Sequence, residues 1–252
     1  MALITSIGSK GGVGTSLVAT NIASAMAHSG PALLVDLHSG TGVDDLLLGV
    51  SPDKSWAELL PVLDELQLKH IELATSVHAS GLKLLYGPDR WRRVVQPDEL
   101  KRLIQALTNF FDFVIVDLPT GLTPLNRSML SISDVTLLIT TADPPALRCA
   151  ERFAAEVELE SKDRVGLVIN QINRQHPSTA AQIAESLDLP LVAALPPDPR
   201  AIGYQIHFGR ACVQDASSMF GRAIRGLTTR LQQSAQVQDK SVQRMDQDRG
   251  IR

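Results

Sequence analysis

Near its start the chain reads Ile7-Gly8-Ser9-Lys10-Gly11-Gly12-Val13-Gly14-Thr15-Ser16, between a short apolar run, residues 3–7, and a segment of helical periodicity. This order predicts a strand, a loop and a helix. Glycines let the backbone of such a loop curl inward, so that its N–H groups point at phosphate oxygens beside the positive end of the helix. We therefore interpret the loop as a nucleotide-binding site.

The loop departs at two positions from the usual phosphate-loop pattern, G-x-x-x-x-G-K-[ST]. The pattern places a glycine where this chain has Ser9 and a lysine where it has Thr15. Ser16 fills the last position, whose hydroxyl binds magnesium in loops of this kind. A lysine is present inside the loop, as Lys10.

The run Lys10-Gly11-Gly12-Val13-Gly14, followed by two small residues, resembles the deviant Walker A loop of the ParA/MinD family, dimeric ATPases that position cargo in bacteria. The resemblance implies binding of ATP or ADP with Mg²⁺, and it makes the serine at position 9 a minor departure. It also implies that Lys10 is catalytic and reaches the nucleotide of the partner subunit, and hence that the chain forms a nucleotide-dependent homodimer. The nucleotide-binding residues that it implies in the loop are Ser9, Lys10, Gly11, Gly12, Val13, Gly14, Thr15, Ser16 and Leu17.

Composition limits the class of protein. At 252 residues and 27.2 kDa the chain fits one α/β domain, although its length also allows two small ones. A net charge of −3 and a pI near 6.1 give no global attraction to nucleic acid or to an anionic membrane. Cys149 and Cys212 lie far apart in the sequence, without the spacing that is typical of metal-binding or redox-active cysteine pairs. No apolar run approaches the ~20 residues that span a bilayer. We expect a cytoplasmic protein without a signal peptide or transmembrane segment; a polar or membrane-peripheral position reached through partners stays open.

A second predicted strand, residues 32–35, ends in Asp36-Leu37-His38. A carboxylate at a strand end beside the phosphates can hold a magnesium-bound water or orient the attacking water. The segment resembles the family's switch I, usually Asp-x-Asp, whose second aspartate helps to activate the hydrolytic water. Asp36 matches the first position, as a catalytic and metal-binding residue, and His38 replaces the second. The alternative is that His38 is merely an exposed loop residue.

Another predicted strand ends in a second acidic residue. Residues 113–117 are a run of β-formers that ends in Asp117, which is the Walker B pattern, and residues 117–121 resemble the family's switch II segment, Asp-x-Pro-x-Gly. Together with the loop, this run predicts that Ser16, Asp36 and Asp117 form a magnesium site at the carboxyl edge of a sheet.

The rest of the chain alternates between strand and helix patterns. Further strands are predicted at residues 82–85, 135–140, 165–170 and 191–195, and helices at 97–107 and 146–159, while residues 43–80 suggest a helix interrupted by Pro61. This order predicts an α/β fold with a doubly wound, mostly parallel sheet and helices on both faces, like that of ParA/MinD-type P-loop NTPases. We assign it to residues 1–231 and expect residues 232–252 to be a polar, disordered tail.

Two strand ends are candidates for contact with the base. Asn170 ends a strand, and its amide suits the donor and acceptor pattern of the adenine edge. The family uses an asparagine here for adenine; without the resemblance, Asn170 is an ordinary strand-terminating residue. By the same resemblance, Pro196 and Asp198, in a rigid turn at residues 196–200, flank the base.

Three surfaces allow alternative interpretations. Arg90-Trp91-Arg92-Arg93 can contact phosphate or stack on a base, but a solvated or partner-binding surface is commoner, so we see no strong signal for nucleic acid. The helix at 146–159 carries charges that pair along its surface or meet a regulator. The stripe Phe220, Ile224, Leu227 and Leu231 is predicted to be core rather than a membrane anchor, because little apolar area follows it, so we see no clear membrane-targeting helix.

Within the family the chain most resembles the CpaE/TadZ branch, localisation factors for pilus assembly, through residues 80–85, 111–119, 145–148 and 195–202. Thr15 removes a fixed positive charge from the phosphates, and His38 removes a carboxylate that would orient water. We therefore expect an ATP-binding positioning or scaffold protein with impaired or absent hydrolysis, at most a weak ATPase. Its expected partners are regulators or pilus and secretion proteins. The alternatives are an active ATPase of the partitioning or septum-placement type, in which Lys10 suffices, and a DNA-partitioning protein.

Overall fold

The structure is a computed structural model of the chain and describes residues 1–88, 95–157, 162–172, 175 and 178–233. The basic cluster at residues 90–93 lies outside the described residues, as does the predicted tail from residue 234 onward. The interpretations that concern them therefore stay predictions.

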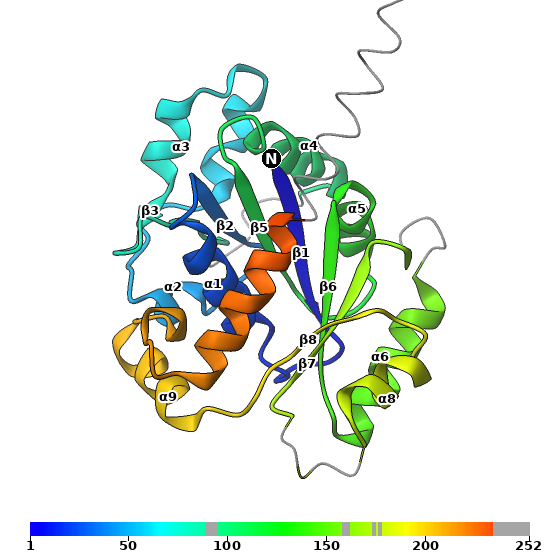
Figure 1. Ribbon diagram of the computed structural model, residues 1–252. Helices are drawn as coiled ribbons and strands as arrows, with labels where there is room; N and C mark the ends of the chain where they lie inside the picture. The colour runs from blue at the N-terminus through cyan, green and yellow to red at the C-terminus, as the bar shows by residue number, and fades with distance from the viewer. Residues whose placement is uncertain (89–94, 158–161, 173–174, 176–177, 234–252) are drawn as a thin grey trace, which may run out of the picture.

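Within the described residues eight strands form one sheet, in the order β3-β4-β2-β5-β1-β6-β7-β8 (Figure 1). Every neighbouring pair is parallel except β3 with β4. The predicted doubly wound, mostly parallel sheet is therefore confirmed. The strands are β1 (Ala2–Gly8), β2 (Ala32–Asp36), β3 (Ser76–Val77), β4 (Lys83–Leu85), β5 (Phe113–Leu118), β6 (Val135–Thr141), β7 (Val165–Asn170) and β8 (Leu191–Ala194).

Helices cover both faces of the sheet (Figure 1). One face packs against α3 (Leu68–Ala74), α4 (Pro97–Leu107), α5 (Pro124–Ile132), α6 (Pro144–Glu156) and α8 (Ala180–Ser186). The other packs against α1 (Thr15–Met26), α2 (Asp44–Leu48), α9 (Pro199–Phe208) and the helix at residues 219–233. Short 3₁₀ turns complete the described elements: η1 (Trp56–Glu58), η2 (Leu60–Glu65) and η3 (Cys212–Gln214).

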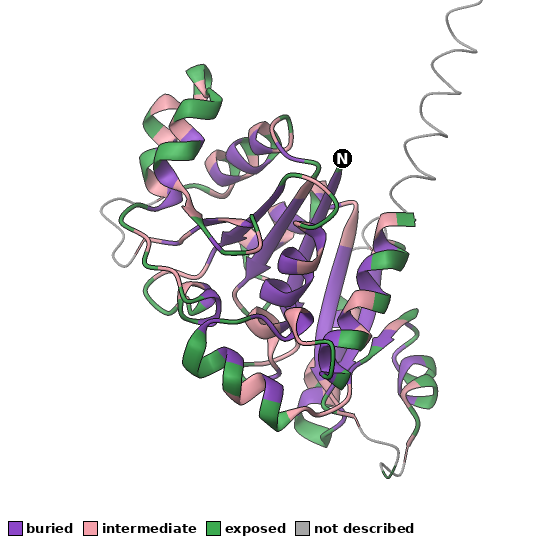
Figure 2. Ribbon diagram, turned by 60° about the vertical axis from the view of Figure 1, so that its left-hand side comes forward, coloured by how far each residue is buried: buried purple, intermediate pink, exposed green. Residues whose placement is uncertain are grey.

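The core explains why apolar runs predicted the strands. All seven residues of β1 and all six of β7 are buried, as parallel strands with helices on both faces must be (Figure 2). The apolar stripe of the helix at residues 219–233 is also part of the core, because Phe220, Ile224 and Leu227 are fully buried. No helix among the described residues is long and apolar enough to cross a bilayer.

Some boundaries differ from the sequence predictions. Residues 43–80 do not form a helix broken at Pro61; they divide into α2, η1, η2, α3 and β3, and Pro61 lies in the first turn of η2, where proline costs no hydrogen bond. The helix predicted at 146–159 begins at Pro144 because the Asp143 side chain caps it by accepting from Ala146 N. The turn at residues 196–200 leads directly into α9, which begins at Pro199.

Candidate functional site

The phosphate loop joins the carboxyl end of β1 to α1 and is fixed to the neighbouring strand β6. Ser9 N donates to Ile139 O over 2.8 Å, and Ser9 Oγ donates to Thr140 Oγ1 over 3.0 Å. Gly12 and Gly14 have φ of +86° and +91°, a left-handed backbone that side chains other than glycine rarely adopt. The sequence interpretation of strand, glycine loop and helix therefore describes the structure.

Asn170 supports this loop from the end of β7. Its Nδ2 donates to Val13 O over 2.8 Å, its Oδ1 accepts from Gln171 N over 2.9 Å, and the residue is fully buried. A Cβ atom on Gly14 would lie 2.5 Å from Asn170 Nδ2, so this glycine is also required by close packing. Asn170 thus positions the loop, and its contact with adenine stays a prediction.

The order of the strands brings the two predicted carboxylates together beside the loop. Asp36 in β2 and Asp117 in β5 are register partners, and both are fully buried. Ser16 Oγ, in the first turn of α1, donates to Asp117 Oδ2 over 2.6 Å. The three predicted magnesium ligands therefore lie at one point of the sheet edge, which is the usual place for ligands in doubly wound folds.

His38 belongs to this cluster rather than to the exposed surface, because its side chain is only 19% exposed. Its Nδ1 lies 2.9 Å from Asp36 Oδ1 and 3.5 Å from Asp117 Oδ2, while its backbone N donates to Asp36 Oδ1 over 2.8 Å. Burial lowers the pKa of His38, but the hydrogen bond to Asp36 and the charges of Asp117 and Asp36 outweigh it, so the pKa is raised above its ordinary value.

Asp44 is a third buried carboxylate of the site, and the sequence analysis missed it. It lies in the first turn of α2 and is fully buried, and its two carboxylate oxygens accept no hydrogen bond from the described part of the chain. Burial and the charges of Asp117, Asp36 and Asp45 raise its pKa well above the ordinary value. In the sequence Asp44 resembles the acidic residues that begin many helices, so nothing there marks it as part of the site.

The site fits a divalent cation. Asp36 Oδ2 and Asp117 Oδ1 are buried and, like Asp44, unpaired within the described residues. Burial raises the pKa of Asp117 to about 7; His38 and the hydrogen bond from Ser16 act in the opposite direction, and the charge of Asp36 adds to the rise. Buried carboxylates without partners are costly unless a cation or a proton neutralises them. Ser16, Asp36 and Asp117 therefore have the donor chemistry that Mg²⁺ requires.

Lys10 and Thr15 occupy different parts of the loop. Lys10 is partly exposed, and its Nζ donates to Gly11 O over 3.3 Å, which leaves the side chain at the outer surface of the loop. Thr15 is partly buried, and a Cβ atom on Gly8 would lie 2.4 Å from its Oγ1. The position that carries the lysine of ordinary phosphate loops thus has a hydroxyl packed against the loop backbone.

The turn that we expected beside the base has a structural role in the fold. Asp198 Oδ1 accepts from Ala201 N over 3.2 Å and caps α9, and its Oδ2 accepts from Ser218 Oγ over 2.7 Å. Pro196 is partly buried just before it. The roles of Pro196 and Asp198 toward a base stay predictions.

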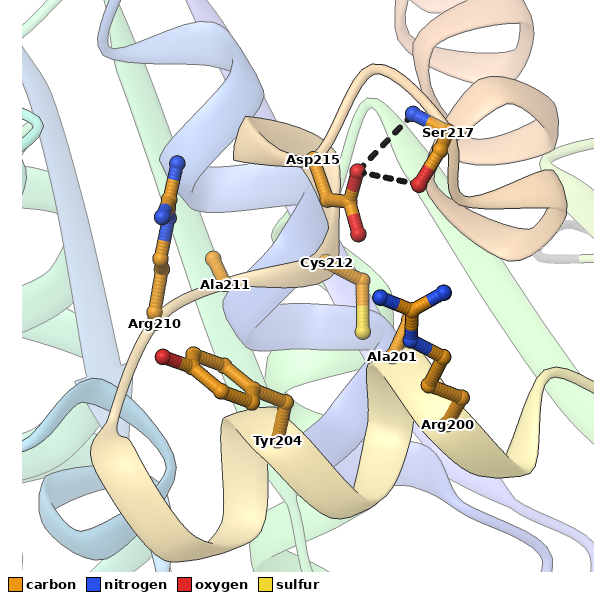
Figure 3. Close-up of a pocket in the computed structure, with 8 residues that line it drawn as sticks. All are labelled: Arg200, Ala201, Tyr204, Arg210, Ala211, Cys212, Asp215 and Ser217. Carbon is orange, nitrogen blue, oxygen red and sulfur yellow. Dashed lines mark hydrogen bonds between the residues drawn. The ribbon is translucent and has the colours of Figure 1, made fainter.

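A separate cavity of about 320 Å³ lies between α9 and residues 210–217 (Figure 3). Arg200 and Tyr204 of α9 line it, opposite Asp215, whose carboxylate accepts from Ser217 N over 2.8 Å. It shares no lining residue with the phosphate loop or the carboxylate cluster. This cavity is therefore separate from the candidate nucleotide site.

Comparison with known proteins matches the part of the chain that holds the loop and the carboxylates. A family model described as "AAA domain" (AAA_31) matches residues 1–167, which include the phosphate loop, Asp36 and Asp117. The chain belongs to the ParA/MinD family of AAA-domain proteins.

Curated relatives of this ParA/MinD protein include septum site-determining proteins. It is 23% identical to MinD of Synechocystis sp. over 229 residues, which cover 88% of this chain and 86% of the relative. It is 26% identical to MinD of Bacillus subtilis over 232 residues, which cover 88% of this chain and 85% of the relative.

Solved structures show the same fold. A ParA family ATPase from Chlorobium tepidum superposes with a TM-score of 0.82 at 21% identity, covering 90% of this chain and 98% of that one. The cell division ATPase MinD of Pyrococcus furiosus gives 0.76 at 26% identity, covering 92% and 98%. MinD of Pyrococcus horikoshii, solved with Mg-ADP, gives 0.77 at 22% identity, covering 94% and 98%.

Proposed function

We propose that this ParA/MinD protein binds ATP or ADP with Mg²⁺ at residues 8–17 and works as a positioning or scaffold protein whose hydrolysis is impaired or absent. The observation that carries the proposal is the contrast within one site. The loop, Ser16, Asp36 and Asp117 are all in place, whereas Thr15 and His38 stand at the two positions that act on the transferred phosphate and on the attacking water.

Binding requires little more than the geometry described. The left-handed glycines at 12 and 14 let backbone N–H groups line a concave anion site at the start of α1. Ser16, Asp36 and Asp117 would hold Mg²⁺, directly or through water, and a bound Mg²⁺ would neutralise part of the phosphate charge. The complex of Pyrococcus horikoshii MinD with Mg-ADP supports the same ligand here.

Two groups that promote hydrolysis in related loops are missing, the lysine at position 15 and the carboxylate at position 38. Phosphoryl transfer depends on positioning and charge stabilisation, and a cation at the phosphates is worth about 10³-fold or more in rate. Thr15 supplies no charge, and His38, hydrogen-bonded to Asp36, offers no carboxylate to orient a water. Lys10 at the outer surface of the loop can supply part of the missing charge across a nucleotide-dependent homodimer, which we also propose.

The biological role that we propose is localisation of a larger assembly. A MinC:MinD complex of Aquifex aeolicus matches this fold, which supports a partner protein or regulator for the present chain too. Within the family we favour the CpaE/TadZ branch and a pilus or secretion system as the cargo. We place the protein in the cytoplasm, with polar or membrane-peripheral sites reached through such partners.

A phosphate-release assay tests the proposal against an active ATPase. We expect release by the purified full chain with ATP and Mg²⁺ to be at background or far below that of active relatives. Lys10, together with the intact remainder of the loop, favours the alternative of a partitioning or septum-placement ATPase. Turnover at the rate of active relatives, abolished in Lys10→Ala, would refute the scaffold proposal and establish that alternative.

A further inference from the structure

Three side chains at the sheet edge are arranged as a set of metal ligands. Asp36, His38 and Asp117 each offer one ligand atom, and these atoms all lie within 4.8 Å of one another. The His38 Nδ1 lies 2.9 Å from Asp36 Oδ1 and 3.5 Å from Asp117 Oδ2. Neighbouring ligands in an octahedral sphere with bonds of about 2.1 Å are about 3 Å apart, so Nδ1 can share one ion with the carboxylates.

A second observation distinguishes this cluster from acidic residues on a surface. Asp44 is fully buried and both of its oxygens are unpaired within the described residues, as are Asp36 Oδ2 and Asp117 Oδ1. Two buried oxygen atoms of the cluster itself, Asp36 Oδ2 and Asp117 Oδ1, therefore lack a partner within the described residues.

The backbone holds His38 in this position. Its N–H donates to Asp36 Oδ1 over 2.8 Å, and Trp56 Nε1 donates to Asp36 O over 3.1 Å. The chain at Gly87 passes so close that a Cβ atom there would lie 2.1 Å from His38 O. A ligand fixed by its surroundings loses little entropy when an ion binds.

We propose that His38 is a metal ligand and makes the nucleotide site select a divalent transition-metal ion, with Mn²⁺ as the representative, over Mg²⁺. The inference rests on the proposed binding of a metal–nucleotide at this site. Mg²⁺ takes oxygen ligands and keeps its waters, whereas imidazole nitrogen suits Fe²⁺, Ni²⁺, Cu²⁺ and Zn²⁺. Mn²⁺ accepts both oxygen and imidazole ligands, which makes it a demanding probe of a preference caused by one nitrogen. An aspartate at position 38 would give an all-oxygen site, and the histidine replaces one oxygen donor with nitrogen.

Mn²⁺ is paramagnetic, which allows a test that does not depend on turnover. Electron spin echo envelope modulation of Mn²⁺ bound to the full chain, with and without ATP, detects a directly coordinated ¹⁴N nucleus. We expect this ¹⁴N signal in the wild type and its loss in His38→Gln, together with a fall in Mn²⁺ affinity of about 10–100-fold. Because Mn²⁺ binds most sites more tightly than Mg²⁺, calorimetry should compare the ratio of the two affinities with that of the matched variant His38→Asp.

The outcomes separate this inference from the proposed function. A preference for Mn²⁺ about tenfold greater in the wild type than in His38→Asp supports it; equal ratios, or bound Mn²⁺ without ¹⁴N coupling, overturn it. If ATP binds but Mn²⁺ does not, His38 acts as the site's own cation, which overturns the metal inference and leaves nucleotide binding intact. A ¹⁴N signal without any binding of ATP would support the metal site and refute the proposed function.

Discussion

Position 15 separates two tasks that one loop usually combines. In the function that we propose, backbone amides and the Ser16 hydroxyl hold phosphate and metal, and neither group depends on the side chain before Ser16. The lysine of an ordinary phosphate loop adds a charge that matters most while the phosphoryl group is in transfer. With Thr15 packed against Gly8, we therefore expect nucleotide binding to be retained and the rate of hydrolysis to be reduced.

Restoring the two missing groups should restore chemistry. Thr15→Lys returns an ammonium to the β- and γ-phosphates, and His38→Asp returns the carboxylate of switch I. We expect the double variant to release phosphate about 10²–10³-fold faster than the wild type, because each group acts on the transition state. A phosphate-release assay measures this rate. The control is a second double variant, Thr15→Arg with His38→Asp, which adds a positive charge without the geometry of a lysine. A folded double variant that binds ATP but is no faster than wild type would contradict this assignment.

Asp44 should make stability depend on pH. Its folded pKa is raised far above the unfolded value of about 3.9, so the folded state favours the protonated form. Its contribution to stability is therefore present at low pH and is lost as the pH rises from about 4 through the folded pKa.

Replacing Asp44 by asparagine should remove this penalty. Without divalent cations we expect Asp44→Asn to be more stable than wild type at pH 8, by about 1–3 kcal/mol, and the difference to shrink toward pH 4. Urea unfolding at several pH values measures it, with the exposed Asp53→Asn as the matched control. A variant whose advantage is the same at every pH would show that the carboxylate is not the cause.

Two helices depend on a close crossing of their carboxyl ends. α2 and α9 end at Gly49 and Gly209, with φ of +60° and +67°, and a Cβ atom on Gly209 would lie 2.2 Å from Gly49 Cα. A polar network at the same place joins α9 to α1: the buried Gln205 Oε1 accepts from Asn21 Nδ2 over 2.8 Å. The helix that begins at the phosphate loop is thus tied to α9.

Alanine at this crossing should therefore be costly. We expect Gly209→Ala to lose about 1–3 kcal/mol from backbone strain, with a further loss from the clash with Gly49. Gly203→Ala, six residues earlier in α9 with no atom within 4 Å of its Cβ, is the matched control and should gain about 0.5–1 kcal/mol. Thermal unfolding compares the two, and equal midpoints would show that the crossing does not stabilise the protein.

The strands could be predicted from the sequence because each is a continuous apolar run, and a parallel sheet buries both faces. α9 was missed because Pro196-Pro197-Asp198-Pro199 indicates a turn, while only the structure shows Asp198 capping a helix. Asp36 and Asp117 could be predicted since each ends an apolar run. Asp44 could not, because its partners come from strands that are remote in sequence, and neither could the position of His38 against both carboxylates.

At the scale of the whole molecule, the function that we propose combines a complete nucleotide-binding edge of the sheet with an incomplete reaction centre. The order β2-β5-β1 places Asp36, Asp117 and the phosphate loop side by side, and the helices on both faces hold that edge in position (Figure 1). In a protein of this kind, the bound nucleotide can determine whether the chain dimerises and binds a partner. Such control does not require a fast cycle of ATP hydrolysis. Occupancy by nucleotide is therefore the property on which the proposed function depends most.

Isothermal titration calorimetry of the full chain with ATP, in the presence of a divalent cation, measures that occupancy directly. Gly14→Ala serves as the variant with a blocked loop, since its Cβ would meet Asn170 Nδ2 at 2.5 Å, and a thermal melt checks that it folds. We predict a saturable heat of association for the wild type, lost in Gly14→Ala, with no phosphate released during the titration above the level of buffer. No heat with ATP or ADP at any workable concentration would contradict the account and leave the loop as an element of architecture alone.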